Sequence, residues 1–391
     1  MSHSTIQPSA VLHHHRSFVF RSAAFRTFLA SVYAGSALGL FAAEKTAVIS
    51  EDVPRLSLQR SLVIGGQGYF PVALRLADGR IAVVLRGGGG HLSIKGRLDM
   101  VFSGDEGKTW TKPVVVVDSP ADDRNPSLGQ AKDGALVVGF WRTETYDEKG
   151  RYNPKLDKPR STWATRSSDG GTTWSEPLQI DVSDIFLGSP FGRIVTLPEG
   201  TMLMGIYGYD IRPPGAKSGG TRNHSYVYQS KDDGRNWNRI SEIGDGRQQL
   251  NETSLLRLPD GKLLAAIRSR AGEVWVSSST DAGFTWSKTR QISPVNGHPG
   301  DLCLLPDGKV LLTVGNRIGP FGVVGIVGTR AGEFDWAKRF TLVDDASSRD
   351  CGYPSSIALK DGRVLTLYYA TKVKEHAAWK VHCGAVFYRV P

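Results

Sequence analysis

Hydrophobic residues recur along the chain as pairs of short apolar runs separated by an Asp-Gly or Glu-Gly turn. Asp-Gly between alternating apolar runs is the strongest short-range signal of a β-hairpin, because glycine accepts the positive φ of the turn. Six such segments follow one another: VALRLADGRIAVVLR, PSLGQAKDGALVVGFW, IVTLPEGTMLMGIY, SLLRLPDGKLLAAIR, LCLLPDGKVLLTVG and SIALKDGRVLTLYY. Their turn glycines are Gly79, Gly134, Gly200, Gly261, Gly308 and Gly362. The pattern predicts six hairpins.

A second repeat, an octapeptide of the form S/T-x-D-x-G-x-T-W, follows most of these hairpins. It reads SGDEGKTW from residue 103, SSDGGTTW from 167, SKDDGRNW from 230 and STDAGFTW from 279, with a weaker copy, TRAGEFDW, from 329. The aspartate is expected to accept backbone N–H bonds, the glycine to take positive φ and the tryptophan to pack beneath the turn. A calcium loop would need later carboxylate ligands, which the octapeptides lack. We therefore interpret them as structural turns of a second hairpin.

Two hairpins in each of six units give six sheets of four strands. The sequence therefore predicts an all-β fold, a six-bladed β-propeller with four-stranded antiparallel blades, in which radial repetition protects the sheet edges. Helical patterns are almost absent. Two polar insertions rich in Gly and Pro, RTETYDEKGRYNPKLDKPR and DIRPPGAKSGGTRNH, follow the second and third hairpins and are expected to form loops over one face.

The first 42 residues have the pattern of a secretory signal peptide. Three arginines precede the apolar run TFLASVYAGSALGLFAA, and cleavage is expected after Ala42, which leaves the domain at 43–391. The run is too short and too Gly-rich for a good membrane span, so we expect a secreted or periplasmic protein with no stable membrane insertion. A disordered tail or an anchor is the alternative interpretation. The histidines at 13–15 fall in this segment, and no metal site is expected there.

Basic residues outnumber acidic ones, with a formal net charge of +10 that becomes +7 when the three arginines of the signal peptide are removed. A basic balance favours anionic partners. No Lys/Arg run interleaved with aromatic residues and no nucleic-acid-binding motif is present, so a carboxylate-bearing sugar is as compatible with this charge as a polyanion. The three cysteines allow one disulfide at most and have no metal-ligand spacing.

Residues at one distance from the turn glycine should converge, because the innermost strand of each blade runs along the central channel. Nine residues before the glycine lie Phe70, Asn125, Phe191, Glu252, Pro299 and Tyr353, and ten before it lie Tyr69, Arg124, Pro190, Asn251, His298 and Gly352. Seven residues after it lie Arg86, Trp141, Tyr207, Arg268, Gly315 and Tyr369, with Arg317 two further on. Core strands should be apolar at these positions. The polar and charged members of the set therefore indicate a site at one rim.

The octapeptides resemble the Asp boxes of the sialidase superfamily, also called bacterial neuraminidase repeats, over nearly the whole chain after residue 42. NETSLLRLPDGKLLAAIR places Glu252 and Arg268 at the family's glutamate and second arginine, and GYPSSIALKDG places Tyr353 at the family's tyrosine. The resemblance implies Tyr353 as the nucleophile that attacks the anomeric carbon and Glu252 as the base that takes its proton. It also implies Arg268 and Arg317 as the second and third arginines that bind a substrate carboxylate.

The chemistry explains why such residues occur together. A free phenol has a pKa of about 10 and is mostly protonated at neutral pH, so a tyrosine nucleophile needs a base. A neutral tyrosine also avoids repulsion with a carboxylate on the carbon under attack. Arginine suits that carboxylate because its planar fork binds it bidentately.

One substrate-binding position departs from the family pattern. Aligning Pro71 in GYFPVALRLADGR with the family's Phe-Arg-Ile-Pro puts Tyr69 where the first arginine belongs. Arg86 and Arg124 are candidates to replace that arginine in space.

The acid/base position departs as well. The family's aspartate in the blade-one loop is missing from RGGGGHLSIKG, which leaves His91 and Asp99 as candidates. His298 and Asp301, in GHPGDL, either fix a loop by a hydrogen bond or act in acid/base chemistry. Asp350 either caps a turn or contacts the substrate.

Three functional hypotheses follow. The leading one is a secreted exo-glycosidase of sialidase type that releases sialic acid or a similar terminal acidic sugar from a glycan or glycoconjugate, without a cofactor and without a nucleic-acid partner. The second is a uronate-specific polysaccharide lyase, in which Tyr353, His91 or His298 removes the C5 proton. The third is a non-catalytic glycan-binding propeller, in which Arg268 pairs with Glu252 to close the channel mouth. No pattern predicts the oligomeric state.

Overall fold

The computed structural model describes residues 56, 58–153, 155–156, 158–211, 222–374 and 376–391. The predicted signal peptide, residues 1–42, lies outside the described residues. Strands dominate the compact unit that begins at Ser50, and its one described helix is the short 3₁₀ turn η1 (Trp336–Lys338). The all-β prediction is confirmed.

Hairpins join the strands in groups of four. The first three groups are β2 (Tyr69–Arg75), β3 (Ile81–Gly87), β4 (Arg97–Ser103) and β5 (Val114–Val117); β6 (Asp122–Gln130), β7 (Leu136–Thr143), β8 (Arg160–Ser167) and β9 (Leu178–Ile180); and β10 (Phe186–Thr196), β11 (Met202–Tyr209), β12 (Asn223–Ser230) and β13 (Asn238–Ile243). The next two are β14 (Leu250–Arg257), β15 (Leu263–Ser269), β16 (Val274–Ser279) and β17 (Arg290–Gln291); and β18 (Gly297–Leu304), β19 (Val310–Asn316), β20 (Gly322–Gly328) and β21 (Phe340–Val343). The last group is β22 (Gly352–Ala358), β23 (Val364–Val373) and β24 (His376–Tyr388), completed by β1 (Gln59–Gly65).

The hydrogen bonds form four four-stranded sheets and one eight-stranded sheet. The eight-stranded sheet has two antiparallel halves, β6–β9 and β10–β13. A short parallel pairing of Gly192 and Arg193 on β10 with β6 joins the two halves. The sequence predicts six separate four-stranded sheets. Four of the six groups form such sheets, whereas β6–β9 and β10–β13 merge into one sheet of eight strands. The two strands lie so close that a Cβ added at Gly129 of β6 would be only 2.6 Å from Cβ of Ile194 on β10, so this position requires glycine.

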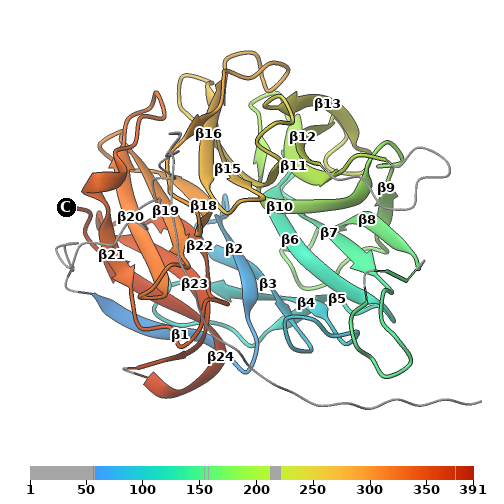
Figure 1. Cartoon of the computed structure of the whole chain (residues 1–391), viewed down its shortest axis with the longest axis horizontal. Helices are drawn as coiled ribbons and strands as arrows, with labels where there is room; N and C mark the ends of the chain where they lie inside the picture. Colours follow the sequence, from blue (N-terminus) through green and yellow to red (C-terminus); the bar gives the residue numbers. More distant parts are fainter. Residues whose placement is uncertain (1–55, 57, 154, 157, 212–221, 375) are drawn as a thin grey trace, which may run out of the picture. The chain divides into compact units, whose positions relative to one another are not determined.

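The first strand of each group lies near the centre, and the other strands lie progressively further out (Figure 1). β2, β6, β10, β14, β18 and β22 each contact the next, and β22 returns to contact β2. The sheets therefore have a propeller-like arrangement around these inner strands. β1 pairs with β24 as the outermost strand of the last sheet, so the two ends of the β-structure lie in one sheet.

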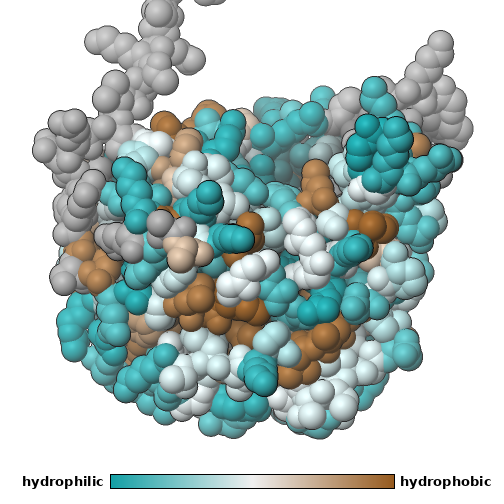
Figure 2. All heavy atoms as spheres, turned by 90° about the horizontal axis from the view of Figure 1, so that it is seen from below, coloured by the Kyte–Doolittle hydropathy of each residue, from teal (hydrophilic) through white to brown (hydrophobic). Residues whose placement is uncertain are grey.

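Apolar side chains pack between neighbouring sheets. Val83 and Leu85 of β3, for example, share a buried cluster with Leu365 and Leu367 of β23. Figure 2 shows one face of the molecule, on which hydrophobic side chains lie among hydrophilic ones. The three cysteines are buried free thiols.

The octapeptide turns have the predicted hydrogen bonds. Asp105 accepts the Thr109 backbone N–H at 2.9 Å and its hydroxyl at 2.6 Å, and Gly107 has a φ of +83°. In a later copy, Trp237 is buried and donates its indole N–H to the carbonyl of Gly234 at 3.0 Å. The interpretation of the octapeptides as structural turns is confirmed at these two sites.

These turns are expected to make stability depend on pH in the acid range. Hydrogen bonds from the hydroxyl and N–H of Thr109 lower the pKa of Asp105 to about 2. An unfolded aspartate has a pKa of about 3.9, so the stabilisation is present above that pH and lost as pH falls towards 2. We expect both Asp105→Asn and Thr109→Val to flatten the pH dependence of the urea-unfolding free energy between about pH 4 and pH 2. An unchanged slope in both variants would show that this turn is not a source of the pH dependence.

A buried ion pair links the inner strands at the centre. Arg193 on β10 donates to Asp301 on β18 at 2.8 Å, to the carbonyl of Ala73 on β2 at 2.8 Å and to the carbonyl of Ser356 on β22 at 2.7 Å. Asp301 also accepts from the hydroxyl of Ser254 on β14 and the amide of Ser356, each at 2.8 Å. Five of the inner strands therefore meet at one charge pair.

Replacing Arg193 with methionine should strongly destabilise the fold. The change leaves Asp301 buried without its counter-charge, which is expected to lower the free energy of unfolding by about 3–5 kcal/mol. Urea unfolding monitored by tryptophan fluorescence measures it. The control is Arg235→Met, because the Arg235–Asp233 pair is exposed and 3.8 Å long and should contribute at most about 1 kcal/mol. Equal losses in the two variants would contradict a role for the central pair.

Candidate active site

The inner strands begin with bulges where the polar positions converge. The register with the adjacent strand shifts between residues 69 and 72 on β2, 124 and 127 on β6, 250 and 253 on β14, and 352 and 355 on β22. Phe70, Asn125 and Tyr353 have φ values of +55°, +46° and +49°, which are uncommon for residues other than glycine. A bulge redirects side chains that would otherwise alternate between the sheet faces. The offset of nine residues from the turn glycine therefore identifies bulge residues.

Tyr353, Glu252 and Arg268 lie in direct contact. The Oη of Tyr353 donates to Oε1 of Glu252 at 2.6 Å. Nη1 of Arg268 donates to Oε2 of Glu252 at 2.8 Å and to Oη of Tyr353 at 3.3 Å. The tyrosine and the glutamate are buried, whereas the Arg268 side chain is 24% exposed. Glu252 is thus in place to accept the phenol proton of Tyr353. The neighbouring Arg268 is a cation that a ligand can reach, because part of its side chain is exposed.

The surroundings keep Tyr353 protonated at rest. Burial raises the pKa of Tyr353 well above its usual value, and the Glu252 carboxylate raises it further, while Arg268 and Arg317 oppose these effects. The phenol is therefore neutral at neutral pH. It can become a strong nucleophile only when its proton moves to Glu252 during attack.

Arg317 lies against the ring of Tyr353, with Cζ 5.3 Å from the ring centroid. Its Nη2 donates to Oη of Tyr369 at 3.2 Å and to the carbonyl of Cys351 at 2.9 Å. Oη of Tyr369 in turn donates to Oδ1 of Asp350 at 2.6 Å. Two of the predicted arginines therefore flank the tyrosine, and Asp350 joins the same network.

Aromatic rings surround Tyr353. Phe70 lies 4.8 Å and Phe191 5.6 Å from it between ring centroids, and Tyr69 lies 5.3 Å from Tyr369. Burial and the nearby Asp350 raise the pKa of Tyr69, so a neutral ring occupies this part of the site. The structure thus places an uncharged side chain at the position that the family pattern gives to its first arginine.

His91 reaches the site from the loop between β3 and β4. Its Nδ1 lies 2.9 Å from Oδ1 and 3.0 Å from Oδ2 of Asp350. The imidazole packs 5.1 Å from Phe70 and 5.5 Å from Tyr69 between ring centroids. The structure therefore brings His91 to the same aromatic group as Tyr353.

Arg86 and Arg124 lie beneath this loop. Arg124 donates to the carbonyl of His91 at 2.7 Å, and Arg86 donates to the carbonyls of Ser93, at 3.1 Å, and Gly90. Both guanidinium groups also bind the buried carboxylate of Asp122, at 2.9 Å and 2.6 Å. Arg86 has no exposed surface. The two arginines predicted to contact the substrate thus hold the His91 loop and do not reach Tyr353.

Asp99 lies away from the tyrosine. It is fully buried on β4, where Oδ1 accepts from Nε of Arg97 at 2.9 Å. Burial raises the pKa of Asp99, although the hydrogen bond and charge of Arg97 oppose the shift. Its side-chain hydrogen bonds are with Arg97 and Gln67, and neither of these residues bonds Tyr353.

His298 lies near the arginines, but its expected pair with Asp301 does not form, because Asp301 accepts from Arg193 instead. His298 is buried, and its Nδ1 has no hydrogen-bond partner among the described residues. Burial, followed by the charges of Arg268 and Arg317, lowers the pKa of His298 to about 2. It is therefore a neutral imidazole beside two cations.

Several residues of the site were not among the predicted catalytic and substrate-binding residues. Tyr369, Phe70 and Phe191 lie at the offsets that identify the rim, but aromatic side chains in a strand fit an ordinary core equally well. Asp122, which binds both loop arginines, follows no repeat. The part of the chain that the structure describes contains no group of three His, Cys, Asp or Glu side chains suited to a metal ion. Within the same residues, no helix has the length and apolar character to cross a membrane.

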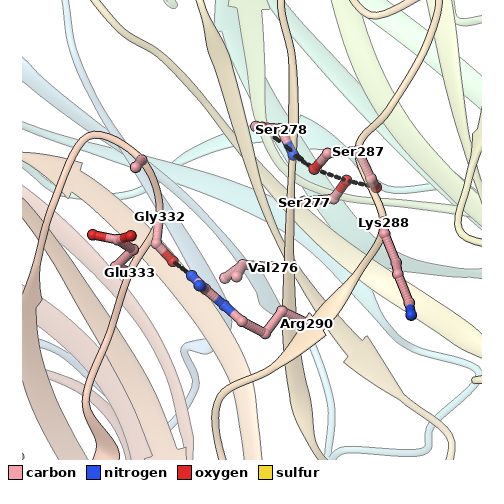
Figure 3. Close-up of a pocket in the computed structure, with 9 residues that line it drawn as sticks. Val276, Ser277, Ser278, Ser287, Lys288, Arg290, Gly332 and Glu333 are labelled. Carbon is pink, nitrogen blue, oxygen red and sulfur yellow. Dashed lines mark hydrogen bonds between the residues drawn. The ribbon is translucent and has the colours of Figure 1, made fainter.

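A separate pocket lies between the outer strands β16 and β17 of one sheet and the turn that follows β20 of the next (Figure 3). It has a volume of about 180 Å³ and is lined in part by Ser277, Ser287, Lys288 and Arg290. Arg290 donates across the gap to the carbonyl of Gly332, and Ser277 donates to the carbonyl of Ser287 at 2.7 Å. The first bond joins β17 to the turn after β20, and the second joins β16 to the loop before β17. The lining includes no residue of the tyrosine site.

The sequence matches the family model described as a BNR repeat-like domain over residues 100–366. A sialidase of Bacteroides fragilis (strain YCH46) is 30% identical over a match of 224 residues, and the match covers 52% of this chain and 39% of that protein. The match thus spans about two fifths of that relative.

Solved structures share the fold. A protein of unknown function from Dyadobacter fermentans superposes with a TM-score of 0.71 at 21% identity, over 85% of this chain and 99% of that one. The NanB sialidase of Streptococcus pneumoniae, as a K499G mutant, gives 0.61 at 16% identity, over 84% and 70% of the two chains. A Trypanosoma rangeli sialidase mutant gives 0.60 at 14% identity, over 85% and 59%. These likenesses show that the chain shares the fold of sialidase structures. The family match, which covers more than half of the chain, shows that the chain belongs to the BNR repeat-like domain family.

Proposed function

We propose that this protein is a secreted, retaining exo-glycosidase of sialidase type, with Tyr353 as its nucleophile. The observation that carries the proposal is the 2.6 Å hydrogen bond from Oη of Tyr353 to Glu252 within a cluster of aromatic side chains flanked by two arginines. A buried phenol bonded to a carboxylate and beside cations is what a tyrosine nucleophile requires. The sialidase of B. fragilis and the sialidase structures that share the fold support this chemistry.

The first step joins the sugar to the enzyme. Oη of Tyr353 attacks the anomeric carbon while its proton passes to Oε1 of Glu252, and the glycosidic C–O bond breaks with its electron pair on the departing oxygen. In the second step, water attacks the same carbon, the C–O bond to tyrosine breaks, and the tyrosyl oxygen regains its proton from Glu252. Two displacements at one carbon retain its configuration.

The substrate that fits is a terminal sugar with a carboxylate near the anomeric carbon. Arg268 and Arg317 supply cationic donors on the two sides of the tyrosine hydrogen-bond network. Because Tyr69 occupies the place of the family's first arginine, we infer a carboxylate held by two arginines. The neutral His298 beside Arg268 and Arg317 adds no charge to the group that binds the carboxylate.

Two further features belong to the proposal. We count the two antiparallel halves of the eight-stranded sheet as separate blades, which gives a six-bladed propeller. We also infer export through the N-terminal segment, with cleavage after Ala42, because of its arginines and apolar run. A secreted enzyme has direct access to terminal sugars of external glycans.

The test is turnover of a panel of fluorogenic glycosides of sialic acid and other terminal acidic sugars. We expect release of one acidic sugar, with retained configuration when the first-formed product is observed by NMR. Release of an inverted product would refute the tyrosine mechanism. A uronate polysaccharide in the same panel tests the lyase alternative, because its unsaturated product absorbs in the ultraviolet. Binding of an acidic sugar without turnover of any glycoside would indicate a binding protein.

A further inference from the structure

His91 and Asp350 form a pair that the tyrosine chemistry described above leaves unused. Asp350 accepts from Nδ1 of His91 at 2.9 Å and from Oη of Tyr369 at 2.6 Å, so two donors fix its position. Burial would raise the pKa of Asp350, but the His91 and Tyr369 hydrogen bonds and the nearby charge of Arg317 lower it below its usual value. Asp350 is therefore an anion at neutral pH that fixes the orientation of the imidazole.

The other edge of the imidazole faces outward. With Nδ1 on Asp350, Nε2 of His91 has no hydrogen-bond partner among the described residues, and the side chain is 37% exposed. Phe70 lies 5.1 Å from His91 and 4.8 Å from Tyr353 between ring centroids. The histidine and the nucleophile thus contact the same ring, and a sugar bound at Tyr353 would be within reach of Nε2.

We propose that His91, oriented by Asp350, protonates the departing glycosidic oxygen and then activates the attacking water. This assignment rests on the proposed glycosidase function and deepens it, because a histidine–aspartate pair replaces the aspartate that the family pattern places in this loop. Asp350 acts through His91 and is a positioning residue.

The proton transfers balance. In the first step, protonated Nε2 gives its proton to the glycosidic oxygen as the C–O bond breaks, and the leaving group departs as an alcohol. In the second step, neutral Nε2 takes a proton from the water that attacks the anomeric carbon, so His91 regains the proton it gave. Glu252 carries the separate proton of Tyr353 in both steps.

The other candidate, Asp99, lacks this access. It has no exposed side-chain surface and bonds Arg97 at 2.9 Å. A proton donor must come within hydrogen-bond reach of the departing oxygen, about 2.6–3.2 Å. The structure favours His91 on this ground.

Charged and titratable groups face His91 from several elements. Asp350 precedes β22, Tyr69 lies on β2 and Tyr369 on β23, and Arg124 on β6 holds the His91 carbonyl at 2.7 Å. Arg317 reaches the pair through Tyr369. Asp350 is therefore the anion adjacent to the imidazolium that acts as acid. Asp350 also accepts from Tyr369, which contacts Arg317, one of the two arginines proposed to bind the substrate carboxylate.

The decisive experiment compares two leaving groups. An aryl glycoside, such as a methylumbelliferyl glycoside, leaves with little need for protonation, whereas a sugar-linked substrate with the same terminal acidic sugar needs an acid. We expect His91→Gln to lower kcat/KM for the sugar-linked substrate by about 10²–10⁴-fold and that for the aryl substrate by less than about tenfold. Equal losses on the two substrates would overturn the assignment.

Two matched variants complete this test. His224→Gln removes a histidine whose Nδ1 is also held by a carboxylate, Glu242 at 2.7 Å, but on β12 away from the tyrosine, and it should leave the ratio of the two activities unchanged. Asp99→Asn should do the same. A selective loss on the sugar-linked substrate in Asp99→Asn would assign the acid to Asp99 and refute the proposal.

A measurement independent of turnover tests the positioning role of Asp350. ¹⁵N NMR of histidine-labelled protein, at a pH where His91 is neutral, should show the tautomer with the proton on Nδ1, and Asp350→Asn should shift it towards Nε2–H. The same variant should lower kcat for the sugar-linked substrate by at least about tenfold, because the wrong tautomer cannot activate water. An unchanged tautomer would show that the pair does not orient the imidazole.

Failure of the assignment and failure of the function are distinguishable. If wild type turns over neither substrate, the glycosidase proposal fails and the acid role of His91 fails with it. If wild type is active and only the leaving-group selectivity of His91→Gln is missing, the glycosidase proposal stands and the assignment alone is refuted.

Discussion

Tyr353→Phe should abolish turnover while leaving the fold intact. The change removes one oxygen, the atom that bonds Glu252 at 2.6 Å, and keeps the ring that packs on Phe70 and Phe191. Loss of a covalent nucleophile leaves only the rate supplied by binding and the remaining groups, so we expect kcat to fall by at least about 10³-fold. Initial rates on the best glycoside of the panel, with the melting temperature of each protein, measure the effect.

A second buried tyrosine provides the control for this variant. Oη of Tyr388 bonds Oγ1 of Thr366 at 2.8 Å in a core cluster that excludes Tyr353. Tyr388→Phe should cost about 1 kcal/mol of stability and keep wild-type turnover. Substantial activity in Tyr353→Phe, at more than about a tenth of the wild-type kcat, would exclude the tyrosine as nucleophile.

Glu252→Gln should lower kcat by about 10²–10⁴-fold, because an amide cannot accept the proton of Tyr353. The amide keeps the size of the side chain and can still accept a hydrogen bond through its oxygen. It also removes the negative charge that holds Arg268 at 2.8 Å, so that arginine becomes more available to an anionic sugar. We therefore expect the Kd for the released acidic sugar, measured by calorimetry, to stay equal or improve while turnover falls.

Glu106→Gln is the matched control for the glutamate. Glu106 pairs with Arg75 at 2.7 Å in the first octapeptide turn, at the opposite end of the strands from Tyr353. It should leave kcat unchanged. Wild-type turnover in Glu252→Gln would refute its role as the base, whereas equal binding without any turnover in wild type would favour the glycan-binding alternative.

The repeats made the strands predictable. Each Asp-Gly turn and each octapeptide lies within a few residues in sequence of the strands that it connects, so local patterns identify the hairpins. Pairings between distant segments leave no such local pattern. β1 joins β24 across nearly the whole chain, and the parallel contact of β6 with β10 depends on the close approach of two inner strands.

The same distinction applies to the site. Glu252 and Tyr353 were predictable at the rim because both lie nine residues before a turn glycine, and Arg268 lies seven residues after one. Their roles came from the resemblance of these segments to the sialidase superfamily. The partners of His91 and Arg86 were not. Asp350 lies 259 residues from His91 in sequence, and the bonds from Arg86 to Asp122 and to the loop carbonyls form only in the folded chain. The sequence therefore indicated which residues carry charge at the rim, and the structure showed which of them bind one another.

The proposed mechanism requires that a sugar become covalently attached to Tyr353. It is tested most directly by incubating the protein with a fluorinated analogue of the sugar that it releases, which slows the second step, and then mapping the adduct by peptide mass spectrometry. We expect one added glycosyl group on the peptide that contains Tyr353, and none in Tyr353→Phe. An active enzyme that forms no adduct, or that carries the adduct on Glu252 or another side chain, would contradict it.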